Sequence, residues 1–223
     1  MKNLKNALLL KQLYQMKQLG YTYTDVTIFK DDEVSISLPN TLESLARQAK
    51  ECHLCALSKQ RNKVVFGEGA SNATLMIVGD APNNSDDSSS HIFTGRAGDI
   101  LTKMIENVLG LKREEVYLSN ILKCHTNNTQ EPSASCAHTC YPYLLKEIAL
   151  IQPTIIMTLG KLAYTYLCGD DSSIEKIHGV VAQKENYKVV PTYHPMYVLK
   201  NPSVKKEVFE DLKIVKSLIA TLH

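Results

Sequence analysis

The sequence has no long apolar run and no large excess of charge of either sign. Its purely apolar runs are short, such as ALLL at residues 7–10, whereas crossing a bilayer takes about 20 apolar residues. Lys11 and Gln12 follow that run directly and interrupt the apolar core that a secretory signal peptide needs. The formal net charge of +2 is too small to indicate a nucleic-acid-binding surface by itself. We therefore expect a cytoplasmic protein, in which cysteines stay reduced.

The first part of the chain has the spacing of a helix. Apolar residues recur at steps of three and four from Leu4 to Leu19, and Gly20 follows as a stop signal. A second, short helix is expected within LPNTLESLARQAKEC at residues 38–52. We predict an N-terminal helical extension over residues 1–45 and the main domain over residues 46–223.

From Ala73 onward, short β-prone segments alternate with helical ones. This alternation predicts an α/β protein, a three-layer α/β/α sandwich with a central, mostly parallel sheet. The expected strands lie in ATLMIVG (73–79), EVYLSNIL (115–122), PTIIMTLG (153–160) and YKVVPTYHP (187–195).

Polar residues and a glycine follow the ends of these expected strands. Asp80, Asn120, Gly160 and His194 each come at or just past a strand end. Ligands of open α/β sheets bind outside the carboxyl ends of the strands. The sequence therefore predicts a binding pocket at this edge of the sheet.

Five cysteines fall in two patches with the spacing of metal ligands. Cys52 and Cys55 form a CxxC pair, and Cys124, Cys136 and Cys140 follow later in the chain. A tetrahedral zinc site would use the first pair together with Cys136 and Cys140, in a CxxC and CxxxC arrangement. A [4Fe–4S] cluster would instead use the first pair together with Cys124 and Cys140. Spacing alone does not separate these two sites.

Six motifs, in order, extend over most of the region from Cys52 to Leu212 and resemble those of the family 4 uracil-DNA glycosylases. This family is the iron–sulfur branch of the uracil-DNA glycosylase superfamily, and each motif alone is a weak signal. The motifs are CHLCALSKQRNKVVFGEG (52–69), GDAPNNSDD (79–87), IFTGRAGDIL (92–101), YLSNILKC (117–124), CYPYLLKEIALIQPTIIMTLGKLA (140–163) and PTYHPMYVL (191–199).

The resemblance implies a cofactor and an activity. It places the ligands of a structural [4Fe–4S] cluster on Cys52, Cys55, Cys124 and Cys140, and leaves Cys136 as an ordinary thiol. It implies a monomeric DNA-repair hydrolase that acts on uracil-containing DNA, cleaves the N-glycosidic bond and leaves an abasic site.

The resemblance also implies roles at the reacting bond. The sugar becomes cation-like while uracil leaves as an anion. Asp80 and Asp86 match family carboxylates that stabilise the cation or position water, and His194 matches the donor to the uracil O2. Ala81, Phe93 and Asn120 match substrate-binding positions, with Phe93 stacking on the flipped base and Asn120 reading its edge.

Surface residues suggest how DNA is held. The segments 58–63, 111–113 and 204–206, together with Lys200, are candidate phosphate-binding clusters. Residues 196–199, just past the histidine, are expected to enter the stack that the flipped base vacates. The loop HTNNTQEPSAS at 125–135 has no basic run, so covalent trapping of the product through a histidine of such a loop is not expected.

Departures from the family pattern leave alternatives open. Asp80 is one methylene shorter than the usual glutamate, and Asn83 replaces a glycine. One alternative is a catalytically weakened iron–sulfur module that binds DNA or associates with a polymerase. Another is a zinc-stabilised α/β domain that acts on a nucleotide or a different base lesion. If residues 80–87 have no role in a pocket, they would be an ordinary solvated loop.

Overall fold

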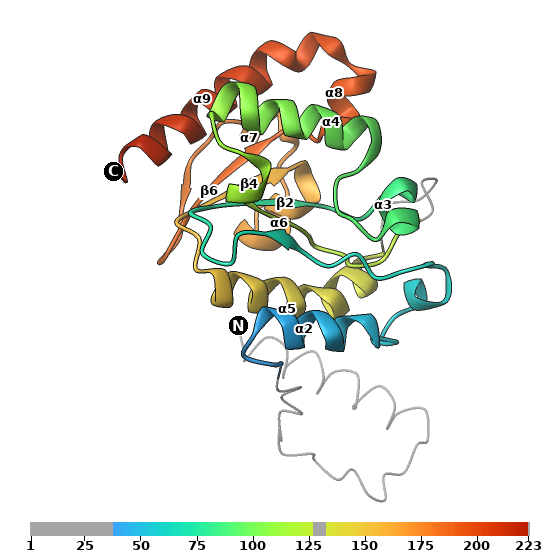
Figure 1. Ribbon diagram of the computed structural model, residues 1–223. Coiled ribbons are helices and arrows are strands. Elements are labelled where there is room, and N and C mark those ends of the chain that lie inside the picture. The colour runs from blue at the N-terminus through green and yellow to red at the C-terminus, as the bar shows by residue number, and fades with distance from the viewer. Residues whose placement is uncertain (1–37, 127–132, 223) are drawn as a thin grey trace, which may run out of the picture. The chain divides into compact units, whose positions relative to one another are not determined.

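The central element is a six-stranded sheet with the strand order β1-β3-β2-β4-β6-β5. The computed structural model describes residues 38–126 and 133–222 (Figure 1). Strands β3, β2, β4 and β6 are parallel, and the two edge strands pair antiparallel. The mostly parallel sheet that the sequence predicts is thus confirmed. The strands are β1 Glu68–Gly69, β2 Leu75–Gly79, β3 Tyr117–Asn120, β4 Ile155–Leu159, β5 Ala182–Gln183 and β6 Lys188–Thr192.

Helices cover both faces of the sheet and complete the predicted three layers (Figure 1). Within β2, Leu75 and Ile77 belong to one apolar core, and Met76 and Val78 belong to the other. This alternation is the period of two that a strand buried on both faces requires. The first core lies under α4 Gly95–Lys103, η2 Met104–Leu109, α8 Pro195–Lys200 and α9 Lys205–Ala220; the second lies under α2 Leu42–Lys50, α5 Ala134–Ile151 and α6 Lys161–Cys168.

Local sequence signals explain where several helices begin and end. The Thr41 side chain accepts from the Ser44 N–H at the start of α2, and Ser133 caps α5 in the same way. Helix α4 continues into the π-helical η2, which ends at Gly110 with φ of 76°. The remaining short elements are η1 Ala56–Lys59, α3 Asn84–Ser89, η3 Arg113–Glu115, α7 Ile174–Ile177 and η4 Pro202–Val204.

The predicted division of the chain falls partly outside the described residues. Residues from Leu38 onward form one structural unit. The predicted N-terminal helix at 4–19 lies outside the described residues, and the predicted boundary at residue 45 falls within α2. No helix in the described ranges is long and apolar enough to cross a membrane.

Candidate active site

The carboxyl ends of the parallel strands bring the predicted polar residues to one edge of the sheet. Gly79 of β2 pairs in register with Asn120 of β3, and the Leu122 N–H donates to the Asp80 carbonyl at 3.0 Å. A Cβ placed on Gly160, after β4, would lie 3.2 Å from Asp80 Oδ2 and 3.6 Å from the His194 Cβ. Asp80, Asn120 and His194 therefore lie together at the carboxyl ends of neighbouring strands, as their positions after the predicted strands indicated.

Asn120 is the most unusual residue at this edge. Its side chain is completely buried, yet among the described residues neither Oδ1 nor Nδ2 has a hydrogen-bond partner. Leaving a buried polar group unpaired costs about 1–3 kcal/mol, so such a group is rare in natural proteins and is a candidate for a functional role. A Cβ on Gly79 would lie 2.5 Å from Asn120 Oδ1 and 2.8 Å from Phe93 Cζ. The glycine thus leaves space for a closely packed amide and aromatic ring.

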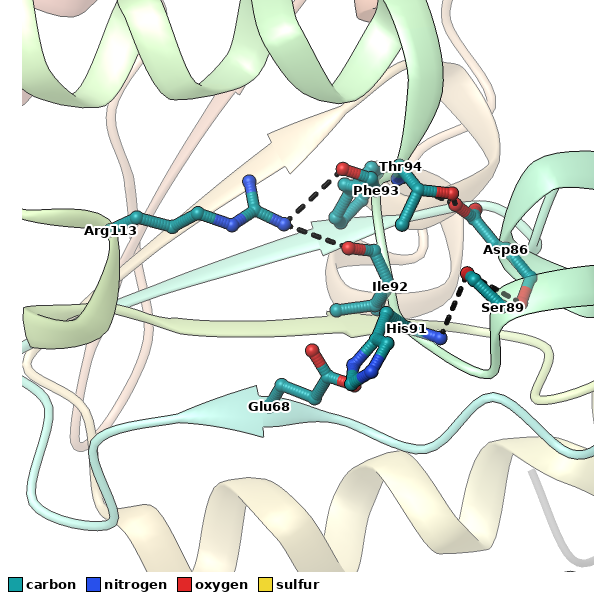
Figure 2. A network of polar contacts seen from close by, with 8 residues as sticks. All are labelled: Glu68, Asp86, Ser89, His91, Ile92, Phe93, Thr94 and Arg113. Carbon is teal, nitrogen blue, oxygen red and sulfur yellow. Dashed lines mark hydrogen bonds and ion pairs between the residues drawn. The ribbon is translucent and has the colours of Figure 1, made fainter.

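Phe93 is held in this position by its backbone. Its φ of 50° lies in the left-handed region, which is uncommon for a non-glycine residue. Arg113 donates from Nη2 to the carbonyls of Ile92, at 2.7 Å, and Phe93, at 3.2 Å (Figure 2). Burial lowers the pKa of Arg113 from its ordinary value. The sequence predicts that Arg113 belongs to a DNA-binding cluster. In the structure, its guanidinium instead binds the backbone of the loop that carries Phe93.

Asp86 supports the same loop from the other side. Its buried carboxylate accepts from the Thr94 N–H at 2.6 Å and from the Thr94 hydroxyl at 2.7 Å (Figure 2). The second oxygen accepts from the Asn83 N–H at 3.0 Å and completes the capping box of α3. These contacts orient the segment that carries Phe93. Asn83, which replaces a family glycine, serves here as the helix cap.

Asp87 and Asp80 each bind a different neighbouring segment. The buried Asp87 accepts from the N–H groups of Asn62 and Lys63 at 3.0–3.1 Å, which ties the loop after the CxxC pair to α3. Asp80 Oδ1 accepts from the Ala163 N–H in the first turn of α6 at 3.0 Å. Asp80 is half-buried, as is Ala81 beside it.

His194 begins α8 and is set up as a neutral donor. Its Nδ1 accepts from the Met196 N–H at 3.1 Å. In the neutral ring, the proton then lies on Nε2. Burial lowers the pKa of His194 to about 4, so the imidazole is neutral at pH 7. The ring centroid lies 6.4 Å from that of Phe93.

Four cysteines line one small cavity between the loop after β3, α5 and the CxxC segment. They are Cys52, Cys55, Cys124 and Cys140, the set predicted for an iron–sulfur cluster. Two of the sulfur atoms accept hydrogen bonds: Arg61 Nη1 donates to Cys124 Sγ at 3.1 Å, and the Lys123 N–H donates to Cys140 Sγ at 3.3 Å. Among the described residues, no group of three or more His, Cys, Asp or Glu side chains is placed to hold a single metal ion.

Comparison with known proteins identifies the family. The model of the Uracil DNA glycosylase superfamily matches residues 66–213, and the chain therefore belongs to this superfamily. A type-4 uracil-DNA glycosylase of Sulfurisphaera tokodaii is 38% identical over 190 residues, which cover 82% of this chain and 86% of the relative. One of Thermotoga maritima is 35% identical over 182 residues, 80% of this chain and 94% of the relative. These relatives place the chain in the type-4 branch and confirm the resemblance seen in the sequence motifs.

A protein of another name shares part of this region. A DNA polymerase of Bacillus phage SP01 is 30% identical over 166 residues, which cover 74% of this chain but only 18% of the polymerase.

Proposed function

We propose that this protein is a uracil-DNA glycosylase of DNA repair, which hydrolyses the N-glycosidic bond of uracil in DNA and leaves an abasic site. The observation that carries the proposal is the buried amide of Asn120, which lies beside Phe93 and has no hydrogen-bond partner in the part of the chain that the structure describes. A flipped base stacked on the ring would supply the missing partners.

The amide matches the edge of uracil atom by atom. Oδ1 accepts from the uracil N3–H, and Nδ2 donates to O4. Cytosine presents the reverse pattern, with an acceptor at N3 and an amino donor at C4. A cytosine in this pocket would leave buried polar groups unpaired, and sites of this type discriminate strongly.

His194 and Asp80 serve the two charges that develop as the bond breaks. The neutral Nε2–H of His194 donates to O2 as uracil leaves with the bonding electron pair. The Asp80 carboxylate stabilises the cation-like sugar and orients the water that attacks its C1′. Asp86, with both oxygens bound inside the protein, acts by holding the Phe93 loop.

The four cavity cysteines fit a [4Fe–4S] cluster. Cys52, Cys55, Cys124 and Cys140 would hold it, and donors on two sulfur atoms suit thiolate ligands. When bound, the cluster supplies a structural cross-link among the loop of residues 52–63, the loop after β3 and α5. The chemistry at the base needs no group from it.

Uracil-containing DNA is the partner, and the protein binds it as a monomer. Met196, Tyr197 and Leu199 are exposed just after His194, where they enter the stack beside the flipped nucleotide. Lys63, exposed at the end of the cysteine loop, and Lys200 contact the phosphates.

Replacing His194 by alanine tests the catalytic proposal. We expect kcat for uracil release to fall by roughly 100- to 1,000-fold, as for the loss of one donor to a developing oxyanion. DNA affinity should change by less than about threefold, because the ring donates mainly to the transition state. Single-turnover assays and DNA-binding titrations measure the two quantities. Weakened DNA binding with an unchanged rate would contradict this role.

The pH dependence follows from the low pKa of His194. Because the folded-state pKa is about 4, the active neutral ring persists well below the ordinary histidine value of 6.5. We expect no loss of kcat/KM from His194 between pH 8 and about 5, and a decline as the pH falls through 4. A loss centred near 6.5 in rapid-mixing assays, absent from the His194→Ala variant, would contradict a ring that stays neutral at this pH.

A further inference from the structure

Lys123 is a charged side chain buried inside the protein, behind the proposed base-binding site. It lies in the sequence between Asn120 and the cavity cysteine Cys124, and its side chain is 3% exposed. Its Nζ donates to Glu147 Oε2 at 2.5 Å, Ser119 Oγ at 2.6 Å and the Asn120 carbonyl at 2.9 Å. Each of the three ammonium protons therefore has its own acceptor, which is the condition under which a buried lysine is tolerated.

Glu147 on α5 is the centre of this network. It accepts from the Tyr117 hydroxyl at 3.0 Å and from the Ser119 hydroxyl at 2.8 Å, besides Lys123. Tyr117 and Ser119 lie on one face of β3, so Asn120 and Leu118 lie on the opposite face. Glu147 therefore holds the strand from the side away from the base pocket.

The turn of residues 64–69 closes over this network. A Cβ on Gly67 would collide with Glu147 Oε1 and the Tyr117 hydroxyl, so the glycine allows the close approach. The Lys123 carbonyl accepts from the Val65 N–H at 2.8 Å, and the ammonium group lies 5.5 Å from the centroid of Phe66. The surrounding chain thus fixes the lysine at both its backbone and its side chain.

We propose that Lys123 is a positioning residue for base recognition, which fixes the Asn120 peptide so that the unpaired amide faces the uracil edge. Replacing a buried ion pair by apolar residues often leaves stability unchanged or raises it. A requirement for stability therefore does not account for a lysine here, whereas a requirement for a fixed peptide does. The proposal deepens the proposed function and rests on it.

Lys123 also borders the cysteine cavity. The backbone N–H of Lys123 donates to Cys140, whereas its ammonium group donates to Ser119, Asn120 and Glu147 and lies near Phe66. A side-chain substitution thus alters the support of Asn120 and keeps the backbone contact to the cavity.

The test variant is Lys123→Met combined with Glu147→Gln, which removes both charges and leaves no unpaired ion. We expect kcat/KM on uracil-containing DNA to fall roughly 10- to 100-fold, as for a small misplacement of a binding group. Affinity for free uracil, measured by calorimetry, should fall by a similar factor. Iron content and melting temperature are measured on the same samples. Leu144→Ala, another buried position on α5, is the control that destabilises without removing a hydrogen bond of the network.

A double-mutant cycle with Asn120→Ala decides the mechanism. If Lys123 acts through Asn120, the charge-neutral pair should lower kcat/KM by less than twofold in the Asn120→Ala background. An equal loss in both backgrounds would overturn the proposal, and so would wild-type activity in the Lys123 and Glu147 variant. Wild-type protein that releases no uracil would overturn the proposed function as well, and that result is read from the wild-type arm alone.

A milder variant keeps the test decisive should the double variant fail to fold. Ser119→Ala removes one acceptor from the Lys123 ammonium group and one donor to Glu147, and leaves both charges paired. We expect a threefold to tenfold lower affinity for free uracil, estimated from the loss of one buried hydrogen bond. An unchanged affinity in this variant would overturn the proposal.

Discussion

Changing Asn120 to aspartate is expected to lower kcat/KM on uracil-containing DNA by at least about 100-fold, because a site built to hydrogen-bond its substrate strongly rejects a mismatched partner. The substitution replaces the Nδ2 donor by an oxygen, which faces the O4 acceptor of uracil. Oligonucleotides with a single uracil, followed by alkaline cleavage of abasic sites, measure the effect.

Asn120→Ala separates recognition from folding. The amide makes no hydrogen bond with residues 38–126 or 133–222, so its removal relieves an unpaired polar cost of about 1–3 kcal/mol. The small cavity that it leaves has a destabilising effect, which opposes this gain. We therefore expect lost activity with a melting temperature within a few degrees of the wild type. Unchanged uracil preference in either variant would remove Asn120 from the pocket.

Changing Cys140 to serine is expected to lower the iron content and the stability together. Cys140 lines the cavity shared by four cysteines, so its loss should release a proposed cross-link between α5 and two loops. A loss of at least about 2 kcal/mol corresponds to a melting temperature roughly 4–8 °C lower for a chain of this size. Iron analysis and thermal unfolding of anaerobically purified protein measure both changes.

Cys136→Ser is the matched control for this prediction. Cys136 is also buried on α5, one turn earlier, but it does not line the four-cysteine cavity. We expect this variant to keep the wild-type iron content. Equal losses of metal from the two variants would favour the zinc arrangement, in which both cysteines are ligands.

The main strands could be predicted because their signals are local. Each of β2, β3, β4 and β6 is a short β-prone run with a polar residue or a glycine at or just past its end, and each lies where the sequence predicts it. The edge strands β1 and β5 have two residues each, and their antiparallel pairing depends on contacts that no local pattern carries. The π-helical segment at Met104–Leu109 also has no sequence period of its own that could predict it.

The residues of the candidate site could be predicted, but the contacts that hold them in place could not. Strand ends and motif order indicated Asp80, Asn120 and His194, which the structure brings together. Nothing in the sequence indicates that Phe93 takes a left-handed conformation or that Arg113 turns inward to hold it.

The role of Lys123 could not be predicted from the sequence either. In the sequence it is one lysine among many, beside a cysteine, and lysines are usually exposed. Only the fold places Glu147, 24 residues along the chain, at its ammonium group. Long-range polar contacts of this kind are set by tertiary packing.

The most direct test of the central claim is base release from four end-labelled oligonucleotides that differ at one position. They carry uracil, thymine, cytosine or hypoxanthine, and wild-type protein purified without oxygen is incubated with each before alkaline cleavage. The account predicts cleavage at uracil, with no detectable cleavage at cytosine or thymine. Tight binding of the uracil strand without cleavage would contradict it, and would instead identify a DNA-binding module that keeps the glycosylase fold.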